Sequence, residues 1–190
     1  MGMEWNVSLF RAINDLGKEY EYLNGLFIFI AEYTVFALAA VLLILWALNK
    51  RSDRIMAVCA LLAFLFAEAA GKFVGKLYVH QNPFAELQDV SKLIEKDIGN
   101  SFPSDHTILF FSICFTFFLF RKKRWYIWML LAVTVGFSRI WVGVHYPADI
   151  MAGAALGILS AWICYRTIPK IGAIKKLSGR GNEEKPAATG

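Results

Sequence analysis

Charged residues are scarce in this sequence, and long apolar runs take their place. Asp, Glu, Lys and Arg make up 18% of the 190 residues, whereas hydrophobic residues make up 57%. A soluble domain needs more polar surface than this composition supplies, so that class of protein is excluded. The chain therefore belongs in a lipid bilayer.

Cysteine is scarce, and a basic cluster near the amino terminus is lacking. The three cysteines, Cys59, Cys114 and Cys164, all fall inside apolar runs, where they cannot form a framework of disulfides between loops. A cleaved signal peptide is not expected, because no basic cluster precedes the first apolar run and that run is too long. The formal net charge is +5, but the basic residues lie in short turns and in the tail, which argues against a nucleic-acid partner.

Five apolar runs meet or approach the length of a membrane-spanning helix. About 20 residues are needed, because a helix rises about 1.5 Å per residue and the hydrocarbon layer is about 30 Å thick. The sequence predicts an all-α fold, a polytopic membrane helix bundle. Its five expected spans are Leu23–Leu48, Ile55–Val79, Ser104–Phe120, Trp125–Val144 and Pro147–Ile168.

The two ends of the chain differ from this membrane-embedded domain, which covers residues 23–168. Residues 1–22 place apolar side chains at helical spacing among charged ones, which is typical of an amphipathic helix in the membrane interface. Residues 169–190 are polar, basic and rich in Gly, Pro and Ala, so we predict a disordered cytoplasmic tail.

Most Lys and Arg residues fall on one side of a five-span topology. They lie in the turns after the first and third expected spans and in the tail, whereas the opposite side has Arg11, Lys18, Lys92 and Lys96. Because cytoplasmic loops carry an excess of basic residues, we expect a cytoplasmic carboxyl terminus and an extracytoplasmic long loop. If the amino-terminal segment formed a sixth span, the amino terminus would lie in the cytoplasm and the orientation of the other segments would not change.

Polar side chains collect near the outer ends of four expected helices. Ionisable residues at such positions are costly and mark functional sites. We expect a single outer pocket there, built from Lys72, Lys76, Asp105, His106, Arg139, His145 and Asp149.

The segment 100–107 predicts a helix start beside a histidine. Ser104 is the expected helix cap, and Asp105 and His106 are the first helical residues. The unpaired N–H groups and the positive dipole end of a helix start bind phosphate well. A plain helix start is the alternative interpretation.

A second segment, residues 138–149, places a nucleophile beside its partners. Pro147 suits the first turn of the last span, so His145 lies just ahead of that helix and Asp149 within its first turn. A carboxylate that accepts the proton of one imidazole nitrogen leaves the other nitrogen with a nucleophilic lone pair. Arg139 offers a planar fork of donors that matches phosphate oxygens.

These segments resemble the second and third signature motifs of the type 2 phosphatidic acid phosphatase (PAP2) family. The matching residues are Pro103-Ser104-Asp105-His106, and Ser138-Arg139 followed by His145 and Asp149 at the family's spacing. The Pro-Ser-Asp-His form is similar to the bacterial undecaprenyl-pyrophosphate phosphatase branch associated with bacitracin resistance. The first motif departs from the family pattern, because Asn82 stands where an arginine is expected before Pro83 and Lys76 precedes it at an unusual separation.

The resemblance implies a metal-independent phosphohydrolase that works through a phosphohistidine. His145 is the implied nucleophile, Asp149 orients it, and His106 protonates the leaving oxygen. The implied phosphate-binding residues are Arg139, Ser104, Lys76, Asp105 and Asn82. No cofactor and no metal is expected, since the adjacent cations would repel a zinc ion bound by the histidines and aspartates.

The implied substrate is undecaprenyl pyrophosphate, a polyprenyl pyrophosphate lipid of the bacterial cell membrane. Its hydrolysis to undecaprenyl phosphate and inorganic phosphate recycles the lipid carrier for cell-wall synthesis and supports bacitracin resistance. Phosphatidic acid or phosphatidylglycerol phosphate is the alternative substrate. A non-catalytic subunit of a drug exporter is the alternative of another class, and the oligomeric state stays open.

Three features keep two interpretations each. Residues 86–98 fit a short amphipathic helix on the membrane or a solvated loop equally well. The intramembrane acids Glu32 and Glu68 could pair with nearby cations or tune the pocket. His80 is expected to be a solvated loop residue rather than a participant.

Overall fold

The computed structural model describes residues 4–47, 51–121 and 125–180, which are mostly helical. Each expected span is matched by one long helix, which confirms the predicted all-α membrane bundle. These helices are α3 (Asn24–Ala47), α4 (Arg51–Leu77), α6 (Asp105–Phe120), α7 (Trp125–Trp141) and α8 (Pro147–Arg180). The shorter elements are α1 (Glu4–Asn14), α2 (Leu16–Glu19), η1 (Glu21–Leu23) and α5 (Pro83–Glu86).

The five long helices differ in length. Within the described residues, three segments are long and apolar enough to cross a membrane: Glu21–Ala47, Ser52–Leu77 and Pro147–Ile168. Helices α6 and α7 are apolar but have only 16 and 17 residues. At about 1.5 Å per residue α6 is about 24 Å long, whereas the hydrocarbon layer is about 30 Å thick. At least one end of α6 therefore lies within the thickness of the bilayer.

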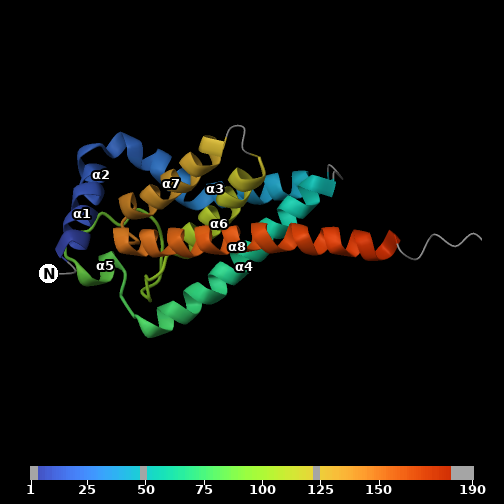
Figure 1. Cartoon of the computed structure of the whole chain (residues 1–190). Helices are drawn as coiled ribbons and strands as arrows, with labels where there is room; N and C mark the ends of the chain where they lie inside the picture. The colour runs from blue at the N-terminus through green and yellow to red at the C-terminus, as the bar shows by residue number, and fades with distance from the viewer. Residues whose placement is uncertain (1–3, 48–50, 122–124, 181–190) are drawn as a thin grey trace, which may run out of the picture.

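Helix α6 forms the centre of the bundle. It packs against α4, α7 and α8, while α3 lies against α7 and α4 (Figure 1). Because α6 carries no charged residue after its first turn, it can be surrounded by other helices. Its buried residues are Thr107, Ile108, Phe110, Phe111, Ser112, Ile113, Cys114, Thr116 and Phe117.

Glycines let α8 approach α6 closely. A Cβ atom on Gly153 would lie 2.8 Å from the carbonyl oxygen of Ser104, and one on Gly157 would lie 2.8 Å from the backbone nitrogen of Ser112. The two glycines are four residues apart and therefore share one helix face. Small residues at this spacing let membrane helices pack backbone to backbone. The start of α6 is thus fixed against the first turns of α8.

The amino-terminal helices α1 and α2 lie across one end of the bundle, near α5 and far from the carboxyl end of α8 (Figure 1). Two buried asparagines of α1 attach it there. Asn6 Oδ1 accepts the N–H of Ala148 at 2.9 Å, and Asn14 Nδ2 donates to the carbonyl oxygens of Ser91 at 2.9 Å and Trp141 at 2.8 Å. Buried amides need such partners, so α1 has a defined seat on the bundle. Its position in the membrane interface stays a prediction.

The long loop after α5 is not helical. Residues 87–104 contain no regular helix, so of the two interpretations of residues 86–98 the structure has the loop. Its backbone groups bind other segments instead. The Ser91 N–H donates to Asn14 Oδ1 at 2.9 Å, and the Leu93 N–H donates to the Val142 carbonyl at 3.1 Å. Tertiary hydrogen bonds therefore replace the helical ladder that the apolar spacing suggested.

Helix α8 continues to Arg180 and so extends well into the segment expected to be disordered. Residues 170–180 include Ala, Ile, Leu and Lys, and adding residues to an existing helix costs much less than starting one. The remainder of the expected tail, residues 181–190, lies outside the described residues.

Candidate active site

A cavity of about 340 Å³ lies at the end of the bundle where α6 begins. Its walls come from α3, the loop of residues 87–104, α6, α7 and the connection between α7 and α8. Both histidines and the arginine of the predicted site share this cavity, which is lined by Glu32, Ile94, Glu95, Lys96, Asp105, His106, Arg139 and His145.

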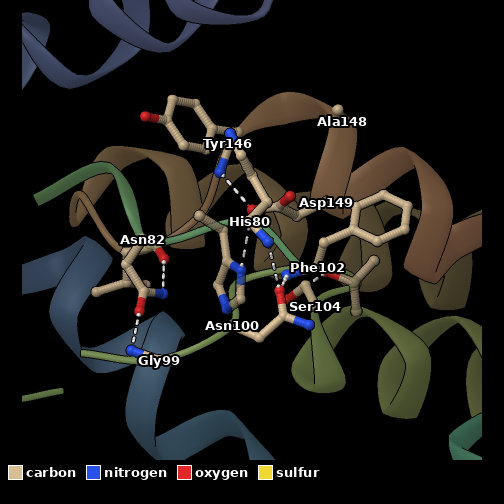
Figure 2. Close-up of polar contacts among 12 residues, drawn as sticks. His80, Asn82, Gly99, Asn100, Phe102, Ser104, Tyr146, Ala148 and Asp149 are labelled. Atoms are coloured by element: carbon tan, nitrogen blue, oxygen red, sulfur yellow. Dashed lines mark hydrogen bonds and ion pairs between the residues drawn. The ribbon is translucent and has the colours of Figure 1, made fainter. Parts of the chain in front are cut away.

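Asp149 orients the imidazole of His145. The Nδ1 atom of His145 lies 3.4 Å from Asp149 Oδ2. The same carboxylate oxygen accepts the backbone N–H of Tyr146 at 2.8 Å (Figure 2). Pro147 opens α8, so the fully buried Asp149 stands in the first turn and folds back over the start of the helix. With the Nδ1 proton facing the carboxylate, the lone pair of His145 is on Nε2.

The surroundings of His145 keep its ring uncharged. Burial lowers the pKa of His145 to about 4, the hydrogen bond with Asp149 opposes this shift, and the charges of Lys96 and Arg139 add to it. At neutral pH the imidazole is therefore neutral, as a nucleophile requires.

The start of α6 is fixed beside Asp149. The Ser104 N–H donates to the Asp149 carbonyl oxygen at 3.2 Å, and Ser104 Oγ accepts from Thr107 Oγ1 at 3.1 Å. Figure 2 shows Ser104 directly below Asp149. Ser104 has the extended backbone of a helix cap. Since the first N–H groups of a helix lack intrahelical partners, the turn that carries His106 presents donors suited to an anion.

Within the described parts of the chain, Arg139 has hydrogen-bond partners at its carbonyl oxygen and at one nitrogen of its guanidinium, but not at Nε. Its carbonyl oxygen accepts the N–H groups of Val144 at 3.2 Å and His145 at 3.3 Å, which fixes the connection to α8. Its Nη1 donates to the Ala31 carbonyl of α3 at 3.1 Å. Its buried Nε atom has no hydrogen-bond partner among the described residues. A buried unpaired donor is costly, so this side chain is suited to an anion in the cavity.

Three expected phosphate-binding residues, Ser104, Lys76 and Asn82, do not line this cavity. Lys76 lines a neighbouring pocket together with Lys72, and Asp105 borders both pockets. Asn82 is fully buried, with its Nδ2 donating to the Val144 carbonyl and its Oδ1 accepting the Gly99 N–H, each at 3.0 Å (Figure 2). Asn82 therefore connects the loop of residues 87–104 to the residue before His145.

The sequence pattern did not single out Lys96. A lysine between the apolar residues of a loop is typical of a solvated face, yet Lys96 Nζ lies 2.7 Å from His145 Nε2. No periodicity or spacing marks this residue; its proximity to His145 comes from the path of the loop.

His80 differs from the expectation of a solvated loop residue. Its ring centroid lies 4.8 Å from that of Tyr146, its Nε2 lies 3.4 Å from Glu86 Oε2, and its side chain is mostly buried. The tyrosine in turn packs on Phe10 of α1, so His80 belongs to the packing that supports the segment around His145.

Across the described parts of the chain, no three His, Cys, Asp or Glu side chains gather as a metal site requires.

Comparison with known proteins identifies the family. The family model of the PAP2 superfamily matches residues 57–173, which include His106, Arg139, His145 and Asp149. The chain belongs to the PAP2 superfamily. The resemblance drawn from the two motifs is thereby confirmed, and the cavity described above is the candidate active site of a PAP2 phosphatase.

Several curated PAP2 relatives match most of the chain. The bacitracin transport permease protein BcrC of Bacillus licheniformis is 52% identical over 174 residues, which cover 92% of this chain and 86% of the relative. The undecaprenyl-diphosphatase BcrC of Bacillus subtilis (strain 168) is 29% identical over 161 residues, or 85% and 83% of the two chains. An undecaprenyl-diphosphatase of Sulfolobus acidocaldarius is 32% identical over 180 residues, or 91% and 82%.

Two solved structures have the same PAP2 fold. LpxE of Aquifex aeolicus superposes with a TM-score of 0.72 at 28% identity, over 85% of this chain and 95% of that one. The transmembrane PAP2 type phosphatidylglycerolphosphate phosphatase of Bacillus subtilis gives a TM-score of 0.64 over 88% of each chain. At 20% identity, this second likeness concerns the fold alone.

Proposed function

We propose that the chain hydrolyses undecaprenyl pyrophosphate to undecaprenyl phosphate and inorganic phosphate, and so recycles the lipid carrier of cell-wall synthesis. The observation that carries the proposal is the shared cavity, in which a neutral His145 beside Asp149 lies with His106 and Arg139. The choice of lipid is supported by the relatives named undecaprenyl-diphosphatase.

The first step transfers the terminal phosphoryl group to the protein. His145 Nε2 forms a bond to the terminal phosphorus, and the bond from this phosphorus to the bridging oxygen breaks. The electron pair stays on the bridging oxygen, which takes a proton from His106 and leaves as undecaprenyl phosphate; such acid catalysis is worth about 10²–10⁴-fold in rate. Arg139 and the start of α6 at Ser104 bind the equatorial oxygens, over which the transition-state charge is spread.

The second step returns the protein to its starting state. Water attacks the phosphorus of the phosphohistidine and gives a proton to His106. The nitrogen–phosphorus bond breaks, its electron pair returns to Nε2, and inorganic phosphate leaves. Asp149 stabilises the positive charge that the His145 ring carries between the two steps. The scheme uses no metal ion.

The proposal places the active site outside the cell and the carboxyl terminus in the cytoplasm. The cavity lies at one end of α6, and Arg121, which further basic residues follow in the sequence, caps the other end. The bias for cytoplasmic basic residues supports this orientation. A cysteine introduced at Glu95 should react with a membrane-impermeant maleimide in intact cells, and one at Lys175 only after permeabilisation. The reverse pattern would contradict the orientation.

The decisive assay compares wild type and His145→Ala on three lipids in detergent. Undecaprenyl pyrophosphate, phosphatidic acid and phosphatidylglycerol phosphate are supplied at equal concentration, and released phosphate is measured with and without a chelator. We expect turnover of the pyrophosphate lipid that survives the chelator and is lost in His145→Ala. A preference for monophosphate lipids would reject the substrate, and turnover by His145→Ala would reject the nucleophile.

A second candidate function comes from the name of one relative. The protein that is 52% identical is called a bacitracin transport permease, which suggests a non-catalytic transport component. That function predicts no phosphate release from any lipid, and bacitracin resistance that is unchanged by His145→Ala. Growth of cells carrying wild type or His145→Ala in bacitracin separates the two functions.

A further inference from the structure

Lys96 reaches into the cavity at the nitrogen that would attack phosphorus. Its Nζ lies 2.7 Å from His145 Nε2, while the other ring nitrogen faces Asp149. A protonated lysine can only donate, so Nε2 accepts this hydrogen bond. The proton of the neutral ring must then be on Nδ1. Lys96 therefore selects the same tautomer that makes Nε2 nucleophilic.

The loop that carries Lys96 is held in place on both sides of this residue. Before it, the Leu93 N–H donates to the Val142 carbonyl at 3.1 Å. After it, the Gly99 N–H donates to Asn82 Oδ1 at 3.0 Å, and the amide of the same asparagine donates to the residue before His145. One buried side chain thus connects the two segments that place Lys96 and His145. The fold therefore places Lys96 beside His145, and the contact does not depend on a flexible side chain at an exposed surface.

We infer that Lys96 is a catalytic residue of the phosphatase reaction, a role that rests on the proposed function. In the empty site its ammonium group donates to His145 Nε2 and holds the reactive tautomer. When a lipid phosphate enters, the phosphorus must take the position in line with Nε2, and the ammonium group moves to an equatorial oxygen. A lysine suits this change, because it is a compact charge on a flexible stem. With Arg139 it places two positive charges around the transferred group.

The charges around Lys96 make this role sensitive to pH. Burial lowers the pKa of Lys96 to about 8; Arg139 of α7 acts in the same direction, while Asp105 of α6 and Asp149 of α8 oppose the shift. The other charged or titratable groups at the cavity are His106, His145, Glu32 of α3 and Glu95 of the same loop. Lys96 is charged at pH 7 and becomes neutral as the pH rises through about 8, so the phosphate then loses one of its cations.

The test compares Lys96→Ala, Lys96→Arg and a control on the same loop, Lys92→Ala. Lys92 does not line the cavity; its Nζ lies 4.5 Å from the ring centroid of Phe84 and donates to the Lys96 carbonyl oxygen at 2.9 Å. Lys92→Ala therefore removes a positive charge and a support of the Lys96 backbone, and leaves the Lys96 ammonium group beside His145. Phosphate release from undecaprenyl pyrophosphate is measured between pH 6 and pH 10. Lys96→Ala should lower kcat/KM by about 10²–10³-fold, which is typical for loss of one donor to transition-state charge. Lys92→Ala should stay within about threefold, since exposed charges contribute little.

The pH profile separates catalysis from a merely structural role. Loss of the proton that His106 gives to the leaving oxygen lowers kcat/KM in every variant, so the variants are compared with wild type at the same pH. Wild type and Lys92→Ala should lose more kcat/KM above about pH 8 than Lys96→Arg, which should keep part of the activity and hold it to higher pH, because a guanidinium stays charged. An alkaline limb that is unchanged in Lys96→Arg would overturn the inference, even if Lys96→Ala failed to fold. Binding of orthovanadate, followed by thermal shift, should weaken at least tenfold in Lys96→Ala and stay unchanged in Lys92→Ala.

The outcomes distinguish the inference from the proposed function. Wild-type turnover together with full kcat/KM and vanadate affinity in Lys96→Ala would overturn the role of Lys96 and leave the proposed function standing. Absence of phosphate release by wild type from every lipid would overturn the proposed function, and the catalytic role of Lys96 with it.

Discussion

Replacing Asn82 with arginine restores the residue that the first family motif leads one to expect before Pro83. If the missing guanidinium were a defect, the substitution would raise activity. The structure predicts the opposite. Asn82 is fully buried outside the lining of the cavity, and both ends of its amide are used, by the Val144 carbonyl and the Gly99 N–H.

The expected loss in Asn82→Arg can be worked from these contacts. An arginine offers no acceptor to Gly99 and needs more volume than the closed site provides. Two disturbed hydrogen bonds cost about 1 kcal/mol each, and over-packing costs about 1–3 kcal/mol more. The free energy of unfolding should fall by about 3–5 kcal/mol and Tm by on the order of 10 °C. The displaced segments carry His145 and Lys96. Because small misplacements of reacting groups slow a reaction strongly, kcat should fall at least about tenfold.

Thermal unfolding and phosphate release in detergent, measured on wild type, Asn82→Arg and Asn82→Asp, test this reasoning. Aspartate keeps the size and the acceptor for Gly99 but loses the donor to Val144, so its losses should be smaller than those of arginine. An Asn82→Arg protein as stable as wild type and more active would refute the reasoning, since it would mean that position 82 faces the phosphate.

Three further predictions concern the nucleophile and its supports. Asp149→Asn should lower kcat by about 10³–10⁴-fold with little change in KM, because an amide can hold the wrong imidazole tautomer; steady-state kinetics checks this. The kcat/KM of wild type should fall below about pH 4 as His145 gains a proton, and the part of its fall above about pH 8 that comes from Lys96 should be absent in Lys96→Arg. Gly143→Ala should lower Tm by several degrees in a melting experiment, because its φ of 81° is strained for other residues and its Cβ would lie 2.5 Å from the Ser91 carbonyl oxygen.

The helices and the convergence of the motif residues could be predicted because the bilayer constrains them. A lipid-exposed backbone must satisfy its own hydrogen bonds, so each apolar run becomes a helix, and the first expected span, Leu23–Leu48, closely matches α3. Alternation of the chain across the membrane places the start of α6 and the end of α7 on one side. His106, Arg139 and His145 come together for this reason.

The parts that sequence reasoning missed depend on contacts between distant segments. Asn14 binds the carbonyl oxygen of Trp141, and Asn6 binds the N–H of Ala148, although neither asparagine belongs to a recognisable motif. The apolar residues of the loop, spaced as in a helix, serve packing instead: Ile94 is buried in a cluster with Trp141. The position of Lys96 beside His145 is a result of that packing. Tertiary contacts overrode the local pattern, and such contacts leave no periodicity to read.

The short central helix determines how deep in the bilayer the chemistry takes place. The basic end of α6, where Arg121 pairs with Asp53 of α4, belongs at a membrane surface, because both charges need water or each other. His106 lies 15 residues before Arg121, a rise of about 22 Å, so it is about 8 Å short of the opposite hydrocarbon boundary. A phosphate that reaches this depth gives up water and gains Arg139, Lys96 and the start of α6 in exchange. A lipid has its tail in the bilayer and its head group close to that depth, whereas a soluble phosphate ester must shed its hydration without any gain from a buried tail. The length of α6 therefore favours lipid phosphates before any contact with the lipid chain is considered.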